Sequence, residues 1–437
     1  MMPNKNKVYL AVALASLSLS LSAAEVHNNE GTSVQFNVEA MAGVFSIDEN
    51  YSGTPGKKNW QEGYAKADIL GERTLDSGSV YGGVGAIVLG TRGDGDGLGI
   101  TTGNEEDIDL EKAFVGWTSG SGMFDLSVGR QPFQLGDGFL IGGDKVSPGN
   151  GFGDNIDRGG AYYLAGRSSF SNTAILKFDP AGPVRGDLFW LQSNNAYQQD
   201  TELSGINVEW VDDALGTLGA SYMKVTDLAL GTGLGAFDQR KGLEVTSIRG
   251  QGSAGVENLF LSFEYVNQQG GDTAVDSDAN AWYVEAGYTF ADLWASPTLN
   301  YRYGEFSGDD AATTSNEAFD PLFYGVTRGF GTWYQGEVAG NYSGPFSSGN
   351  DVSRVDLTLA PREDLQIGIQ YWKFGTQDNA ADLAGNEVDL YALWTINENV
   401  VFSPLVGYYE PKGSDVIAAQ GNDGSNLYMQ AILMYFY

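Results

Sequence analysis

The final residues, 427–437 (LYMQAILMYFY), alternate so that every second side chain is apolar or aromatic. These side chains share one face of an extended strand, because successive residues of a β-strand point to opposite faces. In water such a strand is an aggregation hazard through both its apolar face and its open edge. A closed barrel in a membrane removes the edge and places the apolar face against lipid. The pattern therefore predicts an all-β, transmembrane antiparallel β-barrel.

Residues 1–24 have the pattern of a secretory signal peptide. Lys5 and Lys7 precede an apolar stretch that ends in small residues of the kind a signal peptidase accepts. The alternative, one transmembrane helix, needs about 20 apolar residues, which is more than this stretch supplies. We expect cleavage after Ala24 and a mature barrel with long extracellular loops over residues 25–437.

The composition supports a barrel and excludes several classes of function. The chain has 61 Gly and 22 Phe, 9 Trp and 23 Tyr, yet its mean hydropathy is −0.22, as expected where lipid-facing residues alternate with water-facing ones. It has no Cys, which excludes disulfides and thiol chemistry. A formal net charge of −32 disfavours nucleic acid as a partner, because phosphate binding needs clustered cations.

Eighteen segments are predicted as strands, with connections that alternate between short and long. They are residues 33–46, 60–72, 79–92, 107–117, 123–131, 170–178, 184–193, 203–211, 216–225, 241–249, 257–267, 279–290, 296–305, 351–360, 364–373, 385–395, 399–409 and 425–437. Short turns on one rim and long loops on the other are typical of the periplasmic and extracellular ends of a bacterial outer-membrane barrel. An even number of strands places both termini in the periplasm.

The charged residues of these strands lie opposite the apolar ones. Leu261, Phe263, Val284 and Ile369 are expected to face lipid. The opposite, inward set holds four cationic and nine acidic residues: Lys66, Arg185, Arg302, Arg354, Asp68, Asp187, Glu209, Glu244, Glu264, Glu285, Asp356, Glu387 and Asp389. With about eighteen strands the lumen is too wide for these side chains to fill, which predicts an aqueous channel.

Two connections, residues 132–169 and 306–350, are much longer than the others. Loops of this length are usually functional. Either loop could fold inward and narrow the channel, or it could cap the barrel on the outside against lipopolysaccharide. The sequence leaves both arrangements open.

Two segments resemble a known family of outer-membrane porins. Residues 110–117 (LEKAFVGW) and 126–142 (LSVGRQPFQLGDGFLIG) resemble the signature region of the alginate export family, and residues 316–324 (NEAFDPLFY) resemble a later segment of it. The matching positions are Gly129, Arg130, Gln131, Gly136, Asp137 and Gly138. The resemblance implies a porin fold and passage of an anionic polysaccharide along a strongly basic lining. The acidic inward set departs from that lining.

The predicted pore and substrate path combines these matches with inward and loop charges. Its residues are Arg130, Gln131, Asp137, Arg158, Arg185, Glu264, Glu285, Arg302, Arg328, Arg354 and Asp356. A general base for catalysis is not available at a fixed position, because the single histidine, His27, lies three residues beyond the expected cleavage site. We therefore expect no enzyme activity.

The loop after the third predicted strand partly resembles a calcium-binding loop. With Asp94 at position one, Asp96 falls at position three and Glu105 at position twelve, as in an EF-hand. Leu98 at position five offers no side-chain oxygen. The loop is either a calcium site, the one cofactor the sequence suggests, or a solvated acidic hairpin.

The sequence thus predicts a channel in the outer membrane of a Gram-negative bacterium for passive diffusion of small hydrophilic solutes or oligosaccharides, surrounded by lipid and lipopolysaccharide. Two alternatives stay open. One is export of an acidic polysaccharide, and the other is a surface adhesin or structural barrel whose lumen is closed.

Overall fold

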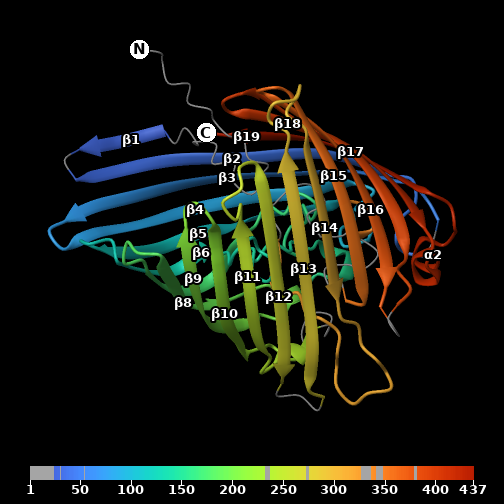
Figure 1. Cartoon of the computed structure of the whole chain (residues 1–437), viewed down its shortest axis with the longest axis horizontal. Helices are drawn as coiled ribbons and strands as arrows, with labels where there is room; N and C mark the ends of the chain where they lie inside the picture. Colours follow the sequence, from blue (N-terminus) through green and yellow to red (C-terminus); the bar gives the residue numbers. More distant parts are fainter. Residues whose placement is uncertain are drawn as a thin grey trace.

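A computed structural model describes residues 24–29, 31–53, 55–231, 237–271, 275–325, 336–340, 348–377 and 381–437. Strand β2 (Thr32–Ile47) and those that follow it each pair antiparallel with the next, and the last, β19 (Asn426–Phe436), pairs with β2. Eighteen strands, β2 to β19, therefore close a barrel (Figure 1). The predicted fold and strand count are confirmed, and no predicted strand boundary differs from the observed one by more than three residues.

The other barrel strands follow the chain in order. They are β3 (Lys58–Leu75), β4 (Gly78–Gly93), β5 (Asn104–Ser119), β6 (Phe124–Pro132), β7 (Ser169–Phe178), β8 (Val184–Gln192), β9 (Glu202–Asp212), β10 (Gly216–Asp227), β11 (Glu244–Gly252), β12 (Leu259–Gly270), β13 (Ser277–Thr289), β14 (Thr298–Phe306), β15 (Asn350–Arg362), β16 (Leu365–Thr376), β17 (Gly385–Asn397) and β18 (Val400–Pro411). Short helices lie in four of the loops: η2 (Asn150–Phe152), η3 (Ala196–Gln198), η4 (Asp238–Arg240) and α2 (Ser414–Gln420). No helix in the described ranges is long and apolar enough to cross a membrane.

One strand was not predicted. β1 (Ala24–Asn29) forms a hairpin with residues 32–36 of β2, whereas β19 pairs with residues 39–47 on the same edge. β1 therefore covers the part of the β2 edge that extends past the end of β19. An uncovered stretch of this edge would offer backbone donors and acceptors to other chains.

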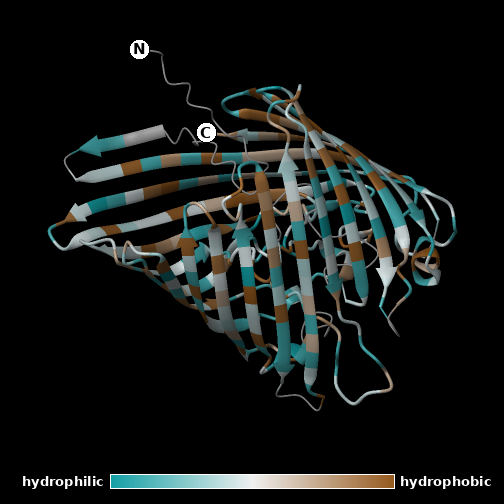
Figure 2. Cartoon of the chain, viewed as in Figure 1, coloured by the Kyte–Doolittle hydropathy of each residue, from teal (hydrophilic) through white to brown (hydrophobic). Residues whose placement is uncertain are grey.

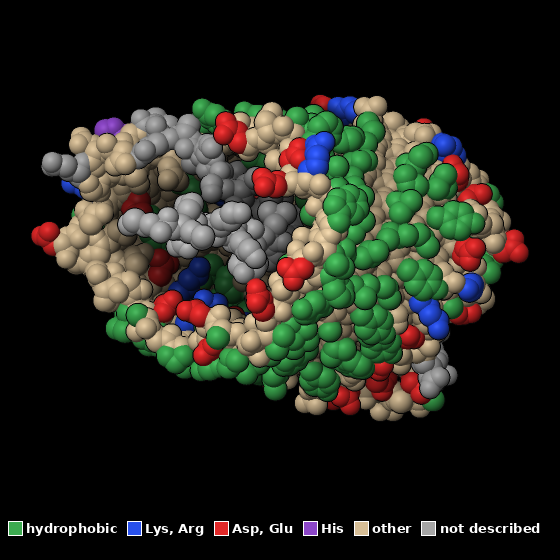
Figure 3. Space-filling view, turned by 45° about the horizontal axis from the view of Figure 1, so that its top comes forward, with side chains coloured by type: hydrophobic (Ala, Val, Ile, Leu, Met, Phe, Trp, Pro, Cys, Tyr) green, Lys and Arg blue, Asp and Glu red, His purple; other side chains and the backbone are tan. Residues whose placement is uncertain are grey.

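The two faces of the strands separate as the alternation predicts. Phe263, Val284 and Ile369 are outward and 39%, 46% and 43% exposed, whereas Glu264 and Glu285 point inward and are buried. Figure 2 shows the resulting alternation of hydrophobic and hydrophilic residues along the strands. In Figure 3 hydrophobic side chains gather over the outer face, beside an opening that contains acidic and basic side chains.

The prediction for Glu244 was wrong. Its neighbours Val245, Ser247 and Arg249 are the buried, inward residues of β11, so Glu244 lies on the outer face, where it accepts a hydrogen bond from Lys224 at 3.0 Å. The local sequence is ambiguous because the apolar residues Val245 and Ile248 stand on opposite faces of the strand. The inward set of charged residues therefore loses the acid Glu244 and gains the cation Arg249.

The face assignment can be tested on β11. Ile248→Arg places a cation on the lipid face at a cost of about 2 to 4 kcal/mol near the bilayer midplane. Gln251, on the same strand, is exposed and faces the lumen, so the Gln251→Arg variant should assemble normally. Heat-modifiable mobility of the two variants in gels measures assembly, and equal assembly would refute the assignment.

The topology can be tested by surface labelling. The short connections, such as residues 120–123, belong to the periplasmic rim, and exposed residues 311–314 belong to the outer rim. An epitope inserted after Ala311 should bind antibody on intact cells, and one inserted after Gly120 should bind only after permeabilisation. Surface labelling at Gly120 would invert the orientation.

Candidate functional site

The long connection between β6 and β7 folds into the barrel. Phe133 and Phe139 are buried and lie against aromatic rings of the wall, with Phe133 4.6 Å from Phe189 and Phe139 5.2 Å from Tyr283 between ring centres. Of the two arrangements that the sequence left open, the described part of this loop therefore adopts the inward one. We call residues 133–143 the inward loop.

The Gly-Asp-Gly segment of the inward loop is fixed to the wall. Tyr283 on β13 donates a hydrogen bond from its hydroxyl to Oδ2 of Asp137 at 2.7 Å. Gly138 has a φ of +91°, and a Cβ built on it would lie 2.5 Å from the carbonyl oxygen of Gly325. Only glycine allows both this conformation and this close approach. The motif that carries the family resemblance therefore shapes the part of the loop that crosses the lumen.

The second long connection is hydrogen-bonded to the inward loop through the backbone. The amide of Phe323 donates to the carbonyl of Leu140 at 3.0 Å, the amide of Gly142 donates to the carbonyl of Phe323 at 2.7 Å, and the amide of Gly325 donates to the carbonyl of Gly138 at 2.8 Å. The described residues 307–325 thus form a strap across the inward loop. Its sequence contains the second segment that resembles the family.

A buried arginine fixes the strap to η4, and a glutamine of β12 fixes it to the wall. Arg240 in η4 is fully buried, and its Nε and Nη2 donate to the two carboxylate oxygens of Asp320 at 2.7 and 2.8 Å. Nη2 also donates to the carbonyl of Leu322 at 3.0 Å. On β12, Gln268 accepts from the amide of Asp320 at 2.9 Å. Bidentate arginine–carboxylate pairs form some of the strongest hydrogen bonds in proteins, so we expect the strap to be rigid near Asp320.

The strap can be released by Asp320→Asn. Removing one partner of a buried ion pair costs about 3 to 5 kcal/mol, because the other charge stays buried. We expect the strap and the inward loop to loosen, and single-channel conductance in planar bilayers to rise and fluctuate. The same change at the exposed Asp423 is the matched control. Unchanged conductance in Asp320→Asn would show that the strap does not limit the channel.

Two more arginines hold the connection between β6 and β7 in place, Arg167 against β5 and Arg158 within the connection itself. Arg167 is buried and pairs with Asp107 at 2.6 Å and with Asp109 at 2.9 Å. Arg158 pairs with Asp144 at 3.3 Å, and burial holds its pKa below the usual value. Both guanidinium groups stabilise the folded loop. The structure thus places Arg158, a predicted path residue, in a loop anchor and away from the lining of the cavity described next.

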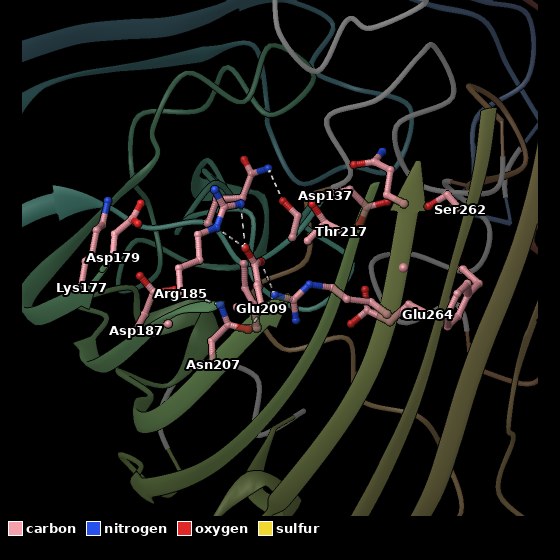
Figure 4. Close-up of a pocket in the computed structure, with 18 of the residues that line it drawn as sticks. Asp137, Lys177, Asp179, Arg185, Asp187, Asn207, Glu209, Thr217, Ser262 and Glu264 are labelled. Carbon is pink, nitrogen blue, oxygen red and sulfur yellow. Dashed lines mark hydrogen bonds and ion pairs between the residues drawn. The ribbon is translucent and has the colours of Figure 1, made fainter. Parts of the chain in front are cut away.

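A cavity of about 430 Å³ lies between the inward loop and the inner wall of β7 to β13 (Figure 4). Its polar lining comes from the loop and seven strands: Gln134, Asp137, Lys177, Asp179, Arg185, Asp187, Asn207, Glu209, Thr217, Arg249, Gln251, Ser262, Glu264 and Tyr283. Three predicted path residues, Asp137, Arg185 and Glu264, meet here. Lys177, Asn207 and Arg249 were missed, although Arg249 follows the outward Ile248 and is inward by alternation.

Four charged groups of the cavity, Arg185, Arg249, Glu209 and Asp187, form one connected network. Glu209 accepts from Arg185 at 2.7 Å through one oxygen and from Arg249 at 2.7 Å through the other. Arg249 also donates to Oδ1 of Asn207 at 2.6 Å, and Asn207 donates to Asp187 at 2.9 Å. One carboxylate therefore pairs with two guanidinium groups and offsets one of their two positive charges.

The other predicted path residues lie outside this cavity. Arg354 on β15 donates to Glu285 at 3.2 Å, and Arg302 and Arg354 lie over the ring of Trp372 at 5.7 and 5.6 Å; Asp356 accepts a hydrogen bond from Gln370 at 3.1 Å. These groups are buried on the inner wall.

The remaining predicted path residues also lie apart from this cavity or outside the described residues. Gln131 is buried and donates to Ser127 and Thr173 at 3.0 and 2.7 Å. Arg130 is partly buried, and its guanidinium forms no hydrogen bond or ion pair with a described side chain. Arg328 lies outside the described residues.

In the acidic loop between β4 and β5, carboxylates accept hydrogen bonds from backbone amides. Asp96 accepts hydrogen bonds from the amides of Leu98 and Gly99 at 2.8 and 2.9 Å, and Glu105 accepts from the amides of Gly103 and Asn104 at 3.0 and 2.9 Å. Asp94 accepts from the amide of Asn59 at 2.9 Å. Within the described ranges, no three His, Cys, Asp or Glu side chains gather as metal ligands. The calcium site stays a prediction.

A closed barrel of eighteen strands with an apolar outer face and a charged, loop-narrowed lumen is the architecture of an outer-membrane porin of Gram-negative bacteria. The alginate export family model matches residues 94–389. This match covers more than half of the chain, so the protein belongs to the alginate export family. No curated protein matches the sequence.

Solved porin structures share the fold at low sequence identity. A BenF-like porin from Pseudomonas fluorescens Pf-5 matches with a TM-score of 0.61 and 11% identity, over 92% of this chain and 98% of that one. OccAB4 of Acinetobacter baumannii matches with a TM-score of 0.58 and 11% identity, over 94% and 100%. OccK5 (OpdH) of Pseudomonas aeruginosa matches with 0.58 and 8%, over 92% and 97%. At these identities the likeness shows the fold alone.

Proposed function

We propose that the protein is a passive diffusion channel for small hydrophilic solutes, with weak selectivity for cations. The observation that carries this proposal is the cavity beneath the inward loop. It is lined by polar groups from the inward loop and seven strands, as a solute path requires. The outward band contacts lipid, and contact of the outer rim with lipopolysaccharide is part of the same proposal.

The sign of the selectivity follows from the lining of the cavity. Five carboxylates, Asp137, Asp179, Asp187, Glu209 and Glu264, face three cations, Lys177, Arg185 and Arg249. Carboxylates lining a pore favour cations. Because the acids outnumber the cations only by five to three, we expect the preference to be weak.

Export of an acidic polysaccharide is the second candidate, and one observation favours it. Arg130 stands in the family motif, and its guanidinium forms no ion pair within 4.0 Å with a described side chain. Against it, the strap and the inward loop cross the lumen, and a long anionic polymer would pass the acidic lining. A barrel that conducts nothing would support the adhesin alternative.

Reversal potentials under a KCl gradient test the proposal. We expect weak cation selectivity in the wild type and a slightly stronger one in Arg130→Ala, because a cation is removed. Arg362→Ala, which changes an exposed ion pair with Asp364 in a short turn, is the control. Clear anion selectivity that Arg130→Ala abolishes would refute the proposal and favour the exporter.

A further inference from the structure

We propose that the cavity beneath the inward loop selects uncharged, polyhydroxylated solutes of the size of a single sugar over carboxylates of the same size. This inference rests on the proposed diffusion function and names its substrate class. It is carried by the pairing of the charges in the cavity, by the position of the remaining acids and by the arrangement of donors and acceptors on the wall.

The arginines of the cavity already share an acid, although the side chain of Arg185 is 48% exposed. Arg185 and Arg249 share Glu209 at 2.7 Å each, and the side chain of Arg249 is only 8% exposed. Gly136 of the inward loop covers Arg249, since a Cβ built on this glycine would lie 2.8 Å from Cδ of the arginine. A solute carboxylate would have to compete with Glu209 for both guanidinium groups.

The third cation has an acid directly beside it. Lys177 on β7 stands opposite Asp187 on β8 in the strand register, and Asp179 also lines the cavity. On the far side, Asp137 and Glu264 face the same space from the loop and from β12 (Figure 4). A carboxylate that leaves water for this cavity therefore loses hydration and meets acids on two sides.

Hydroxyl groups suit the same wall. Exposed donors, Lys177 and Arg185, alternate with acceptors such as Asp187, while Gln251 and Thr217 can do both. A hydroxyl donates and accepts at once, whereas a carboxylate only accepts and an ammonium only donates. A ring that carries several hydroxyls can thus replace water along this wall without an unpaired charge. A cavity of about 430 Å³ has room for such a ring.

Three probes of one ring size separate the possibilities: glucose, glucuronate and glucosamine. Each is added to the full-length protein in planar bilayers, and the concentration that halves the channel current is measured. We expect glucose to block at a concentration at least about fivefold lower than glucuronate does, a difference of about 1 kcal/mol. Glucosamine, a cation of the same ring size, should block at least as well as glucose, because acids outnumber cations in the lining.

Glu209→Gln makes the test sharper. It keeps the shape of the side chain but frees two guanidinium groups, so glucuronate should now block better than glucose. Glu363→Gln, at an exposed turn residue, should leave the wild-type order unchanged. If Glu209→Gln does not assemble, the comparison of the three probes on the wild type still decides.

The outcomes distinguish this inference from the function on which it rests. Conductance with equal block by glucose and glucuronate, or with stronger block by glucuronate, would overturn sugar selection and leave the channel. A wild type that conducts no current would overturn the diffusion function itself, and the substrate class with it.

Discussion

The backbone hydrogen bond is the interaction on which this structure depends. Lipid offers no donors or acceptors, so every strand must be paired on both edges within the membrane. Closure of β19 onto β2 meets this requirement, and β1 extends the pairing along the part of β2 that β19 does not reach. Closure also fixes the faces, because inward and outward residues then alternate around the whole barrel. The charged lumen follows from closure, and the loops inside it are built on that lining.

Local alternation therefore predicts the barrel well and the interior poorly. Leu261 and Phe263 could be assigned to lipid because their strand alternates without interruption. Glu244 could not, because Val245 and Ile248 give conflicting signals, and the same conflict concealed Arg249. The inward loop depends on contacts between residues far apart in the sequence, such as Tyr283 with Asp137, which no local pattern contains. The candidate site was predicted in part, through Asp137, Arg185 and Glu264.

The two segments that resemble the alginate export family have a common structural role. The carbonyl of Leu140 in the first segment accepts a hydrogen bond from the amide of Phe323 in the second, and the carbonyl of Gly138 accepts one from Gly325, the residue after it. Arg240 fixes the second segment through Asp320. These residues build the crossing of the lumen. Most of the lining beneath it comes from strands that the motifs do not include, and the first segment adds Gln134 and Asp137. The motifs therefore encode the narrowing of the channel and leave most of its lining to the rest of the barrel.

The separation of narrowing from lining also bears on how a chain with a formal charge of −32 distributes its acids. Many acids cap loop backbones, as Asp96 does, or anchor loops, as Asp107 does with Arg167. Within the cavity Glu209 is shared between two arginines, and five carboxylates face three cations, so the lining keeps a small acidic excess. On the proposed function, this excess and the hydrogen-bonding groups of the wall act in the same direction. A solute carboxylate meets like charges, whereas a hydroxyl group can pair with donors and acceptors alike.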